Sequence, residues 1–392
     1  MLLSKQRSPM QPTTPIKLQI SLLLLATMGV MSGIAIVATL PLIGHHFNNI
    51  ENIDFLSKLL LTIPSIMIAL VAPLAGIIVD KYGRLKPLYI GVFFFIVGGS
   101  SGFYLNDFYY ILVGRALLGL SVAFIMTSSL ALIGDLFDEK SRHKFMSLQG
   151  MAVGFGGIVF IISGGYLANL GWHYPFLIYA LPLLFIPLFL ITFKEPKRIV
   201  HTHNEGDNVS PKLLPVYLTG FFSMLLFYML PTQMPYLVIN ELGGSPSSVG
   251  FFIGFAMFIN ALVAKQYHRL KARFSFRAIF VIIYLFFGTG LFIISQVNEP
   301  NQLYGASLFM GVGFGLVLVN INVWLLSLVE PHRRGRAVGL LTSSFFLGQF
   351  FSPILFQPVV SAVGIQGLFF YVALLSFVIA IVLFVKENFT DT

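Results

Sequence analysis

The chain alternates long apolar runs with short polar segments along its 392 residues. A helix needs ~20 mostly apolar residues to cross the ~30 Å hydrocarbon core of a membrane. The run lengths therefore predict an all-α integral membrane protein with twelve transmembrane helices. We place these helices at 18–43, 55–79, 87–105, 108–133, 145–169, 173–193, 213–239, 246–264, 278–296, 302–328, 336–362 and 367–385.

Composition supports the membrane assignment, because 57% of the residues are hydrophobic, 10% are charged and the mean hydropathy is +0.87. Soluble domains do not combine these values. The chain has no cysteine. Disulfides, cysteine-ligated metal sites and thiol nucleophiles are therefore excluded, and no other metal-binding motif is expected.

Basic residues lie almost entirely on one side of the predicted membrane. With both termini on the same side, all but Lys58 and Arg115 of the 24 Lys and Arg residues fall in the termini and connections on that side. This asymmetry predicts a plasma (inner) membrane protein with both termini in the cytoplasm. It also explains the net charge of +9 without a nucleic-acid partner. The run at 18–43 is too long for the apolar core of a cleavable signal peptide.

Two related six-helix bundles are predicted. The longest polar stretch, at 195–212, divides a bundle at 1–194 from a second at 213–392. Shifting the chain on itself by 192 positions aligns the fourth, fifth and sixth predicted helices with the tenth, eleventh and twelfth. The matched pairs are Gly119 with Gly311, Asp138 with Glu330, Arg142 with Arg334, Lys144 with Arg336, Gly156 with Gly348 and Tyr179 with Tyr371. Transporters commonly carry a substrate path between two such repeats.

The loop after the second predicted helix carries a motif of glycines and charges. Its members are Gly76, Asp80, Lys81, Gly83, Arg84 and Lys86. Gly76 permits close helix approach, Asp80 supplies an anion, and Gly83 turns the chain. The loop resembles a signature of the major facilitator superfamily, although Leu85 stands where a second basic residue is usual. The resemblance implies that this loop latches the two halves of a transporter.

Arg115 is the only charged residue that we place deep in a predicted span. A mid-helix Arg costs ~2.5–3.5 kcal/mol on insertion scales, so it usually faces a cavity or a partner. Its surroundings resemble a motif of the superfamily's drug:proton antiporter branch, with departures at Ile111 and Leu118. The resemblance implies a role in proton coupling or substrate contact. The structural alternative is that Arg115 ties backbone carbonyls of neighbouring helices.

Small residues predict tight helix packing in both halves. The fifth helix lacks the central Gly-Pro of the antiporter signature, which weakens the resemblance there. The candidate packing residues are Gly119, Gly154, Gly156, Gly164, Gly165, Gly348 and Pro353.

Proton coupling has no obvious acidic carrier, since none of the 15 acidic residues lies deep in a predicted span. His45 with His46, or Asp80 with Arg115, are the candidate titrating groups. Neutral polar residues inside spans are candidates to line a cavity, with helix-to-helix bonding as the alternative role. These are Tyr228, Gln233, Asn260, Asn320 and Gln349, with Asn322 and Gln357 as further examples.

The sequence therefore predicts a secondary transporter that works by alternating access. The resemblance favours proton-coupled export of a drug-like or siderophore-like molecule. Import or facilitated diffusion of a small metabolite, and a non-transporting sensor, are the alternatives. No enzymatic motif is present. The expected partners are a small-molecule substrate and the lipid bilayer, with no cofactor beyond a proton gradient, and the family pattern implies a monomer.

Overall fold

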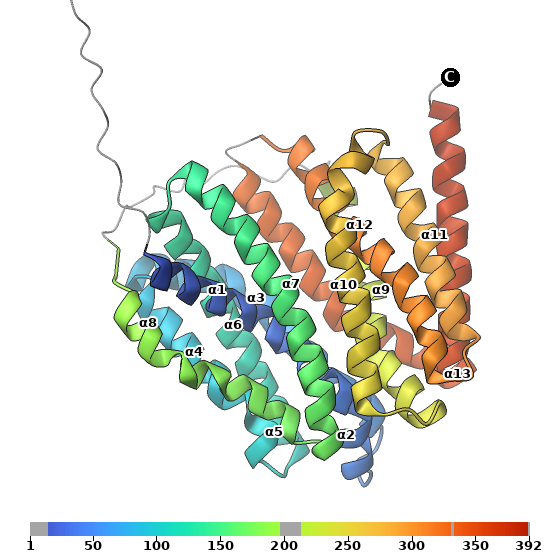
Figure 1. Cartoon of the computed structure of the whole chain (residues 1–392), viewed down its shortest axis with the longest axis horizontal. Helices are drawn as coiled ribbons and strands as arrows, with labels where there is room; N and C mark the ends of the chain where they lie inside the picture. Colours follow the sequence, from blue (N-terminus) through green and yellow to red (C-terminus); the bar gives the residue numbers. More distant parts are fainter. Residues whose placement is uncertain (1–14, 197–212, 331–332, 391–392) are drawn as a thin grey trace, which may run out of the picture.

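The structure is a computed structural model that describes residues 15–196, 213–330 and 333–390. Most of the predicted linker at 195–212 lies outside the described residues, as do Lys5, Arg7, Lys197, Arg198 and Lys212. The described residues form a bundle of helices (Figure 1). The helices of the first half are α1 (Ile16–Ile34), η1 (Val37–Thr39), α2 (Leu40–His46), α3 (Ile53–Tyr82), α4 (Leu85–Gly99), α5 (Ser101–Tyr104), α6 (Phe108–Leu136), α7 (Glu139–Leu170), η2 (Tyr174–Leu184) and α8 (Ile186–Thr192).

The helices of the second half follow within the described residues. They are α9 (Leu214–Tyr236), η4 (Leu237–Glu241), α10 (Pro246–Lys271), α11 (Phe276–Ser295), η5 (Pro300–Gln302), α12 (Leu303–Leu328) and α13 (Arg334–Thr390). α13 is interrupted at Gly364, where φ is 74° and ψ is 173°. A positive φ suits glycine and ends a right-handed helix. The two parts of α13 are therefore the eleventh and twelfth spans.

The described residues contain 11 helical stretches that are long and apolar enough to span a membrane, the last of which is α13 with its break. The prediction of twelve transmembrane helices is confirmed. Some spans are irregular inside. The first breaks between α1 and α2, and the sixth is a 3₁₀ helix, η2, continued by α8.

The two halves repeat each other at the level of helix contacts. A Cβ added at Gly119 in α6 would lie 2.5 Å from the carbonyl oxygen of Pro64 in α3. A Cβ added at Gly311 in α12 would lie 2.6 Å from the carbonyl oxygen of Ala256 in α10. Gly311 follows Gly119 by the same number of residues as Ala256 follows Pro64. In each half, the missing side chain lets two helix backbones touch.

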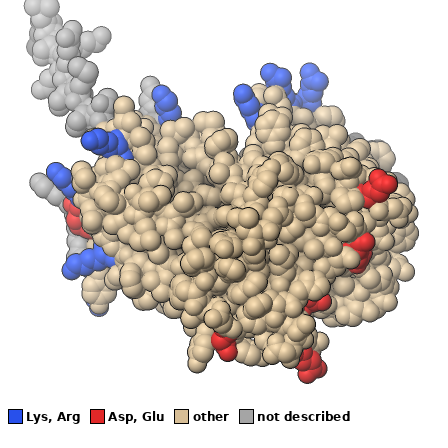
Figure 2. All heavy atoms as spheres, turned by 60° about the horizontal axis from the view of Figure 1, so that its bottom comes forward, with Lys and Arg blue, Asp and Glu red and all other residues tan. Residues whose placement is uncertain are grey.

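Charged residues distinguish the two ends of the bundle. The end that carries Lys81, Arg84, Lys86, Lys265 and Arg269 is called the basic end, and the opposite end is called the acidic end. Figure 2 shows blue Lys and Arg side chains along the upper and left edges and most red side chains lower and to the right. Described acidic residues near the acidic end are Glu51, Asp54, Asp107, Glu241 and Glu299.

At the acidic end, the two halves are in close contact. A Cβ at Gly165 in α7 would lie 2.8 Å from the carbonyl oxygen of Pro246 in α10. Between α3 and α13, Lys58 donates to Gln357 at 2.8 Å and Ser65 donates to Gln349 at 2.9 Å. These contacts close the acidic end.

Toward the basic end, the same helix faces are unpartnered. Gly76 follows Lys58 on α3 by about five turns and so shares its face. Gly154 likewise lies on nearly the same face of α7 as Gly165, about three turns away. A Cβ at Gly76 or at Gly154 would have no heavy atom within 4 Å. The close packing predicted for these two glycines is therefore absent in this conformation, because the halves diverge toward the basic end.

Candidate substrate cavity between the two halves

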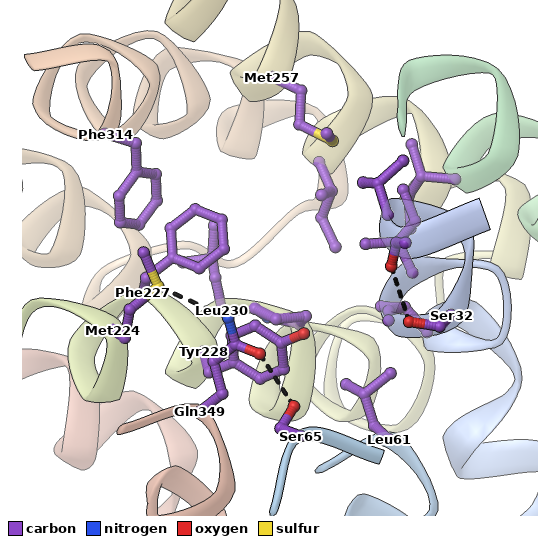
Figure 3. A pocket seen from close by; sticks show the side chains of 18 of the residues that line it. Ser32, Leu61, Ser65, Met224, Phe227, Tyr228, Leu230, Met257, Phe314 and Gln349 are labelled. Carbon is purple, nitrogen blue, oxygen red and sulfur yellow. Dashed lines mark hydrogen bonds between the residues drawn. The ribbon is translucent and has the colours of Figure 1, made fainter. Parts of the chain in front are cut away.

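A cavity of about 270 Å³ lies between the two halves, near the middle of the bundle (Figure 3). α1, α3 and α7 line it from the first half, and α9, α10, α12 and α13 line it from the second. Small-molecule pockets typically enclose ~300–1,000 Å³, so this cavity suits a compact ligand. Its apolar lining includes Ile34, Leu61, Met224, Phe227, Leu230, Met257, Phe314 and Phe346.

A few neutral polar groups interrupt this apolar surface. Ser65 donates to the amide oxygen of Gln349 at 2.9 Å, and the amide nitrogen of Gln349 lies 3.8 Å from the sulfur of Met224. Tyr228 lies beside Gln349 and near Ser65 in Figure 3. Asn260 lines the cavity wall from α10. None of the described residues that line the cavity is acidic or basic. The site therefore fits an amphipathic molecule with polar groups that neutral side chains can bond.

Three of the five predicted cavity residues line this space: Tyr228, Asn260 and Gln349. The other two are buried elsewhere. Gln233 accepts a hydrogen bond from Lys58, whereas Asn320 accepts from Tyr267 at 2.8 Å and donates to the Phe276 carbonyl at 3.2 Å. Asn320 thus ties α12 to α10 and α11, which is the alternative role considered for these amides.

Arg115 lies behind the cavity and is completely buried. Its Nε donates to the carbonyl oxygen of Leu60 in α3 at 2.7 Å, and its Nη2 donates to the carbonyl oxygen of Ser32 in α1 at 2.7 Å. The guanidinium carbon lies 5.1 Å from the ring centroid of Tyr179. Nη1 has no hydrogen-bond partner. In this conformation Arg115 ties backbone carbonyls, and Ser32 connects it to the cavity wall.

Local sequence explains why those two carbonyls need a partner. In a continuous helix, the Leu60 carbonyl would accept from the N–H of residue 64, but Pro64 has none. The Ser32 carbonyl lies just before the break where α1 ends at Ile34. A buried carbonyl left unbonded costs about 1–3 kcal/mol. Arg115 therefore replaces two hydrogen bonds that the helices cannot make for themselves.

Lys58 is a second buried cation, which sequence analysis did not single out. Its side chain in α3 is 1% exposed. The ammonium donates to the amide oxygens of Gln233 and Gln357 at 2.8 Å each, and lies 4.5 Å from the ring centroid of Tyr236. The sequence placed Lys58 near the predicted helix start at 55. Burial there depends on α9 and α13, which contribute the partners from far along the chain.

The loop between α3 and α4 forms a charged cluster at the basic end. Arg84 donates to Asp80 at 2.8 Å and to Asp135 of α6 at 3.0 Å. Burial by itself lowers the pKa of Arg84, but these two carboxylate bonds outweigh it, so the pKa lies above its ordinary value. Glu195 accepts from the backbone N–H groups of Arg84 and Leu85, at 2.6 and 2.9 Å, and so caps α4.

Within this loop, Gly83 has a φ of 93°, a conformation that glycine adopts without strain. Lys81 lies 5.3 Å from the ring centroid of Tyr82, and Lys86 is exposed. Sequence analysis missed Asp135 and Glu195. Both lie far from the loop along the chain, and the topology alone brings them to it.

The other packing residues are in close contact with neighbouring helices. Gly164 and Gly348 face the backbone carbonyls of Ala35 and Phe221, and a Cβ at Gly156 would lie 3.1 Å from the methyl carbon of Thr27. Pro353 lies inside α13, beside a hydroxyl of Ser352 that donates to the Leu225 carbonyl at 2.9 Å.

The candidate proton carriers from the sequence do not gather at one site. Asp80 is separated along α3 from Leu60, the partner of Arg115, by about 30 Å. His45 bonds Asn240 of the second half at 3.3 Å, and His46 lies 4.9 Å from the ring of Trp172. Both histidines are exposed at the acidic end.

A central cavity shared by two repeated helical bundles, closed at one end and diverging at the other, defines a membrane transporter of the alternating-access type. Comparison with family models agrees. The Major Facilitator Superfamily model matches residues 20–264 and 216–391, and the chain belongs to this family. It is therefore a multi-pass membrane transporter of a small molecule and not an enzyme.

Among curated proteins, the chain is similar to multidrug resistance protein 1 of Bacillus subtilis, with 27% identity over 298 residues, 73% of this chain and 76% of that protein. It is 24% identical to the class B tetracycline resistance protein of Escherichia coli over 364 residues, 88% of each chain. A shorter stretch of 118 residues is 34% identical to the quinolone resistance protein NorB of Staphylococcus aureus, 30% of this chain and 25% of that protein.

Among solved structures, a bacterial homologue of the human lysosomal transporter Spinster, in an inward-facing and occupied conformation, matches with a TM-score of 0.76 at 16% identity. The match covers 94% of this chain and 96% of that one. A D-xylose-proton symporter matches with a TM-score of 0.71 at 18% identity, covering 93% and 97%. These likenesses show the major facilitator fold.

Proposed function

We propose that this protein is a proton-driven exporter of a drug-like organic molecule. The observation that carries the proposal is the cavity between the two halves. The first half lines it with aliphatic side chains and serines, and the second half with aromatic and methionine side chains and neutral amides. Such a surface binds amphipathic molecules by shape and apolar contact. The relatives named for multidrug, tetracycline and quinolone resistance support export over import.

The charges around the cavity favour substrates without a net positive charge. Lys58 and Arg115 lie near it, and no described lining residue is acidic. A permanent cation would therefore meet no carboxylate in the site and two like charges behind its wall. Neutral and zwitterionic compounds, such as tetracycline and quinolones, fit this pattern better than cationic dyes.

The basic end is proposed to face the cytoplasm, in accordance with the bias of Lys and Arg. In this orientation, the conformation described is open inward, and a substrate enters the cavity from the cytoplasmic side. The two bundles, at 1–194 and 213–392, are proposed to rock about the cavity as a functional monomer.

A cellular efflux assay tests the proposal. Cells that express the protein are loaded with tetracycline, a quinolone or ethidium, and retention is followed with and without a protonophore. We expect lower retention of tetracycline or the quinolone, loss of this effect with the protonophore, and little change for ethidium. Unchanged retention of all three compounds would reject drug export. Efflux that survives the protonophore would reject proton coupling.

A further inference from the structure

Lys58 connects the two halves at the closed, acidic end of the cavity. It lies on α3, one turn from Leu61 in the cavity wall. Both hydrogen-bond acceptors of its ammonium belong to the other half, Gln233 on α9 and Gln357 on α13. Because the bonds cross between the halves, any motion that opens the acidic end must break them.

The surroundings of Lys58 are built for an ammonium group. A lysine ammonium only donates hydrogen bonds, so both glutamines must turn their oxygens toward it. The amide nitrogen of Gln233 is left buried without a partner as a result. A buried N–H without a partner is costly. The ring of Tyr236, whose centroid lies 4.5 Å from the ammonium, also favours a cation at this position.

We propose that Lys58 carries the transported proton and, when protonated, holds the acidic end closed. The acidic end is called the outer gate, and Lys58 with its two glutamine partners is called the lock. This inference rests on the proposed function. When Lys58 is protonated, its ammonium holds Gln233 and Gln357 and keeps the acidic end closed. When it is neutral, these charge-assisted bonds are lost and the acidic end opens.

The cycle balances one proton against one substrate molecule. With the acidic end open, the Lys58 amine takes a proton from the outer solution, and the charged side chain then closes this end on the two glutamines. With the basic end open, the ammonium releases that proton through the cavity to the cytoplasm as substrate binds. The neutral amine no longer holds the gate, so the loaded protein opens outward.

Few other charges lie near this lock. Asp54 precedes Lys58 by one turn of α3, and its backbone carbonyl accepts from the Tyr236 hydroxyl at 3.1 Å. From α2, His45 bonds Asn240. From α6, Arg115 bonds the Leu60 carbonyl. The contacts described from α9 and α13 are the neutral glutamines and Tyr236. Lys58 is therefore the most enclosed amine at the gate.

The absence of native cysteine allows a direct measurement of the gate. Spin labels at Asn49→Cys and Asn301→Cys, both exposed at the acidic end, report the distance between the halves. In wild-type protein we expect the closed distance at low pH and a growing open population as the pH rises. Lys58→Arg keeps the charge and should stay closed at every pH. Lys58→Met should raise the open-to-closed ratio by about tenfold at low pH and remove its pH dependence.

Transport supplies a second readout that a purely structural role would not change. In vesicles, Lys58→Met should lose proton-driven accumulation of tetracycline but retain exchange of labelled for unlabelled tetracycline, which needs no net proton movement. Gln357→Leu, which leaves the lysine in place, controls for folding and should open the gate while retaining a pH response.

The outcomes distinguish the proposed lock from the proposed export and from a role of Lys58 in folding. A pH-dependent distance in Lys58→Met equal to wild type, or proton-driven accumulation by that variant, would overturn the lock while leaving proton-driven export intact. If wild type moves no tetracycline under any gradient, the proposed function fails, and the distance measurement still tests the gate. A loss of both exchange and accumulation with the gate unchanged would assign Lys58 to folding and reject the inference.

Discussion

Arg115 shows how a charge can be retained inside a membrane protein for the sake of the backbone. Two helices have carbonyls without helical partners, one because of Pro64 and one because α1 ends at Ile34. A guanidinium group can serve both, because its N–H groups point in several directions within one plane. Its Nη1 has no hydrogen-bond partner and is available to a rearranged state of the site.

This account predicts coupling between Arg115 and Pro64. Arg115→Met should lower the melting temperature of the purified protein, because the Leu60 carbonyl is then left unbonded, at a cost of about 1–3 kcal/mol, whereas the Ser32 carbonyl keeps the Tyr179 hydroxyl at 3.3 Å. In the Pro64→Ala background, the restored N–H of residue 64 can bond the Leu60 carbonyl. Arg115→Met should therefore lower the melting temperature less in that background than in the wild type. Size-exclusion chromatography after heating measures all four proteins of the cycle. Additive effects of the two changes would contradict the explanation.

The residues of the site were predictable only where they act within their own part of the chain. Arg115 lies well inside an apolar run, so its burial could be expected. Lys58 lies near a predicted helix boundary, and such boundaries are uncertain by several residues. Its partners Gln233 and Gln357 come from the other half. No local pattern specifies that pairing.

At the scale of elements, the loop between α3 and α4 works as a cluster with three carboxylates around one arginine. Asp135 is 16% exposed, whereas Asp80 is 56% exposed. The better-buried pair is less screened by water and salt. Arg84 therefore anchors the loop mainly to α6, and Asp80 remains accessible to partners at the basic end.

Substitutions in this cluster should separate anchoring from latching. Asp80→Asn should abolish transport while leaving expression and melting temperature unchanged. Asp135→Asn should lower both transport and melting temperature, because Arg84 then loses its better-buried acceptor. Lys265→Gln, an exposed change at the same end but outside this loop, is the control and should behave as wild type. Normal transport by Asp80→Asn would show that the loop does not latch.

Elements themselves followed well from the sequence, because each apolar run must satisfy its own backbone inside lipid and so becomes a helix. The irregular parts did not. The break between Ile34 and Leu40 and the 3₁₀ helix at Tyr174–Leu184 lie inside runs as apolar as any other. Tertiary partners such as Arg115 and Tyr179 stabilise the break, and these partners are not visible in a local pattern.

At the scale of the whole molecule, the contacts along one face of α3 show which end of the protein is closed. Along α3, Lys58 and Ser65 touch α13, whereas Gly76 on the same face meets open space. The sequence predicted a glycine for close approach, and alternating access explains why that approach is missing here. The sequence must suit every conformation of the transport cycle. It therefore does not indicate which of these conformations a single structure shows.

Gly76→Leu should therefore be well folded but inactive. The added side chain has room in the conformation described, and leucine favours a helix over glycine by about 0.5–1 kcal/mol. It would clash when the basic end closes. We expect unchanged or higher melting temperature and loss of tetracycline transport. Gly305→Leu in α12, also in open space but at the acidic end, is the control. Full transport by Gly76→Leu would contradict closure along this face.

The central claim is that a proton gradient drives substrate out through this cavity, and purified protein in vesicles tests it most directly. Tetracycline movement is followed after a pH gradient of either direction, or none, is imposed across the membrane. The account predicts accumulation against the tetracycline gradient in the acidic compartment, and equilibration without accumulation when the gradient is absent. Equal movement under all three conditions, or movement in the same direction as protons, would contradict it.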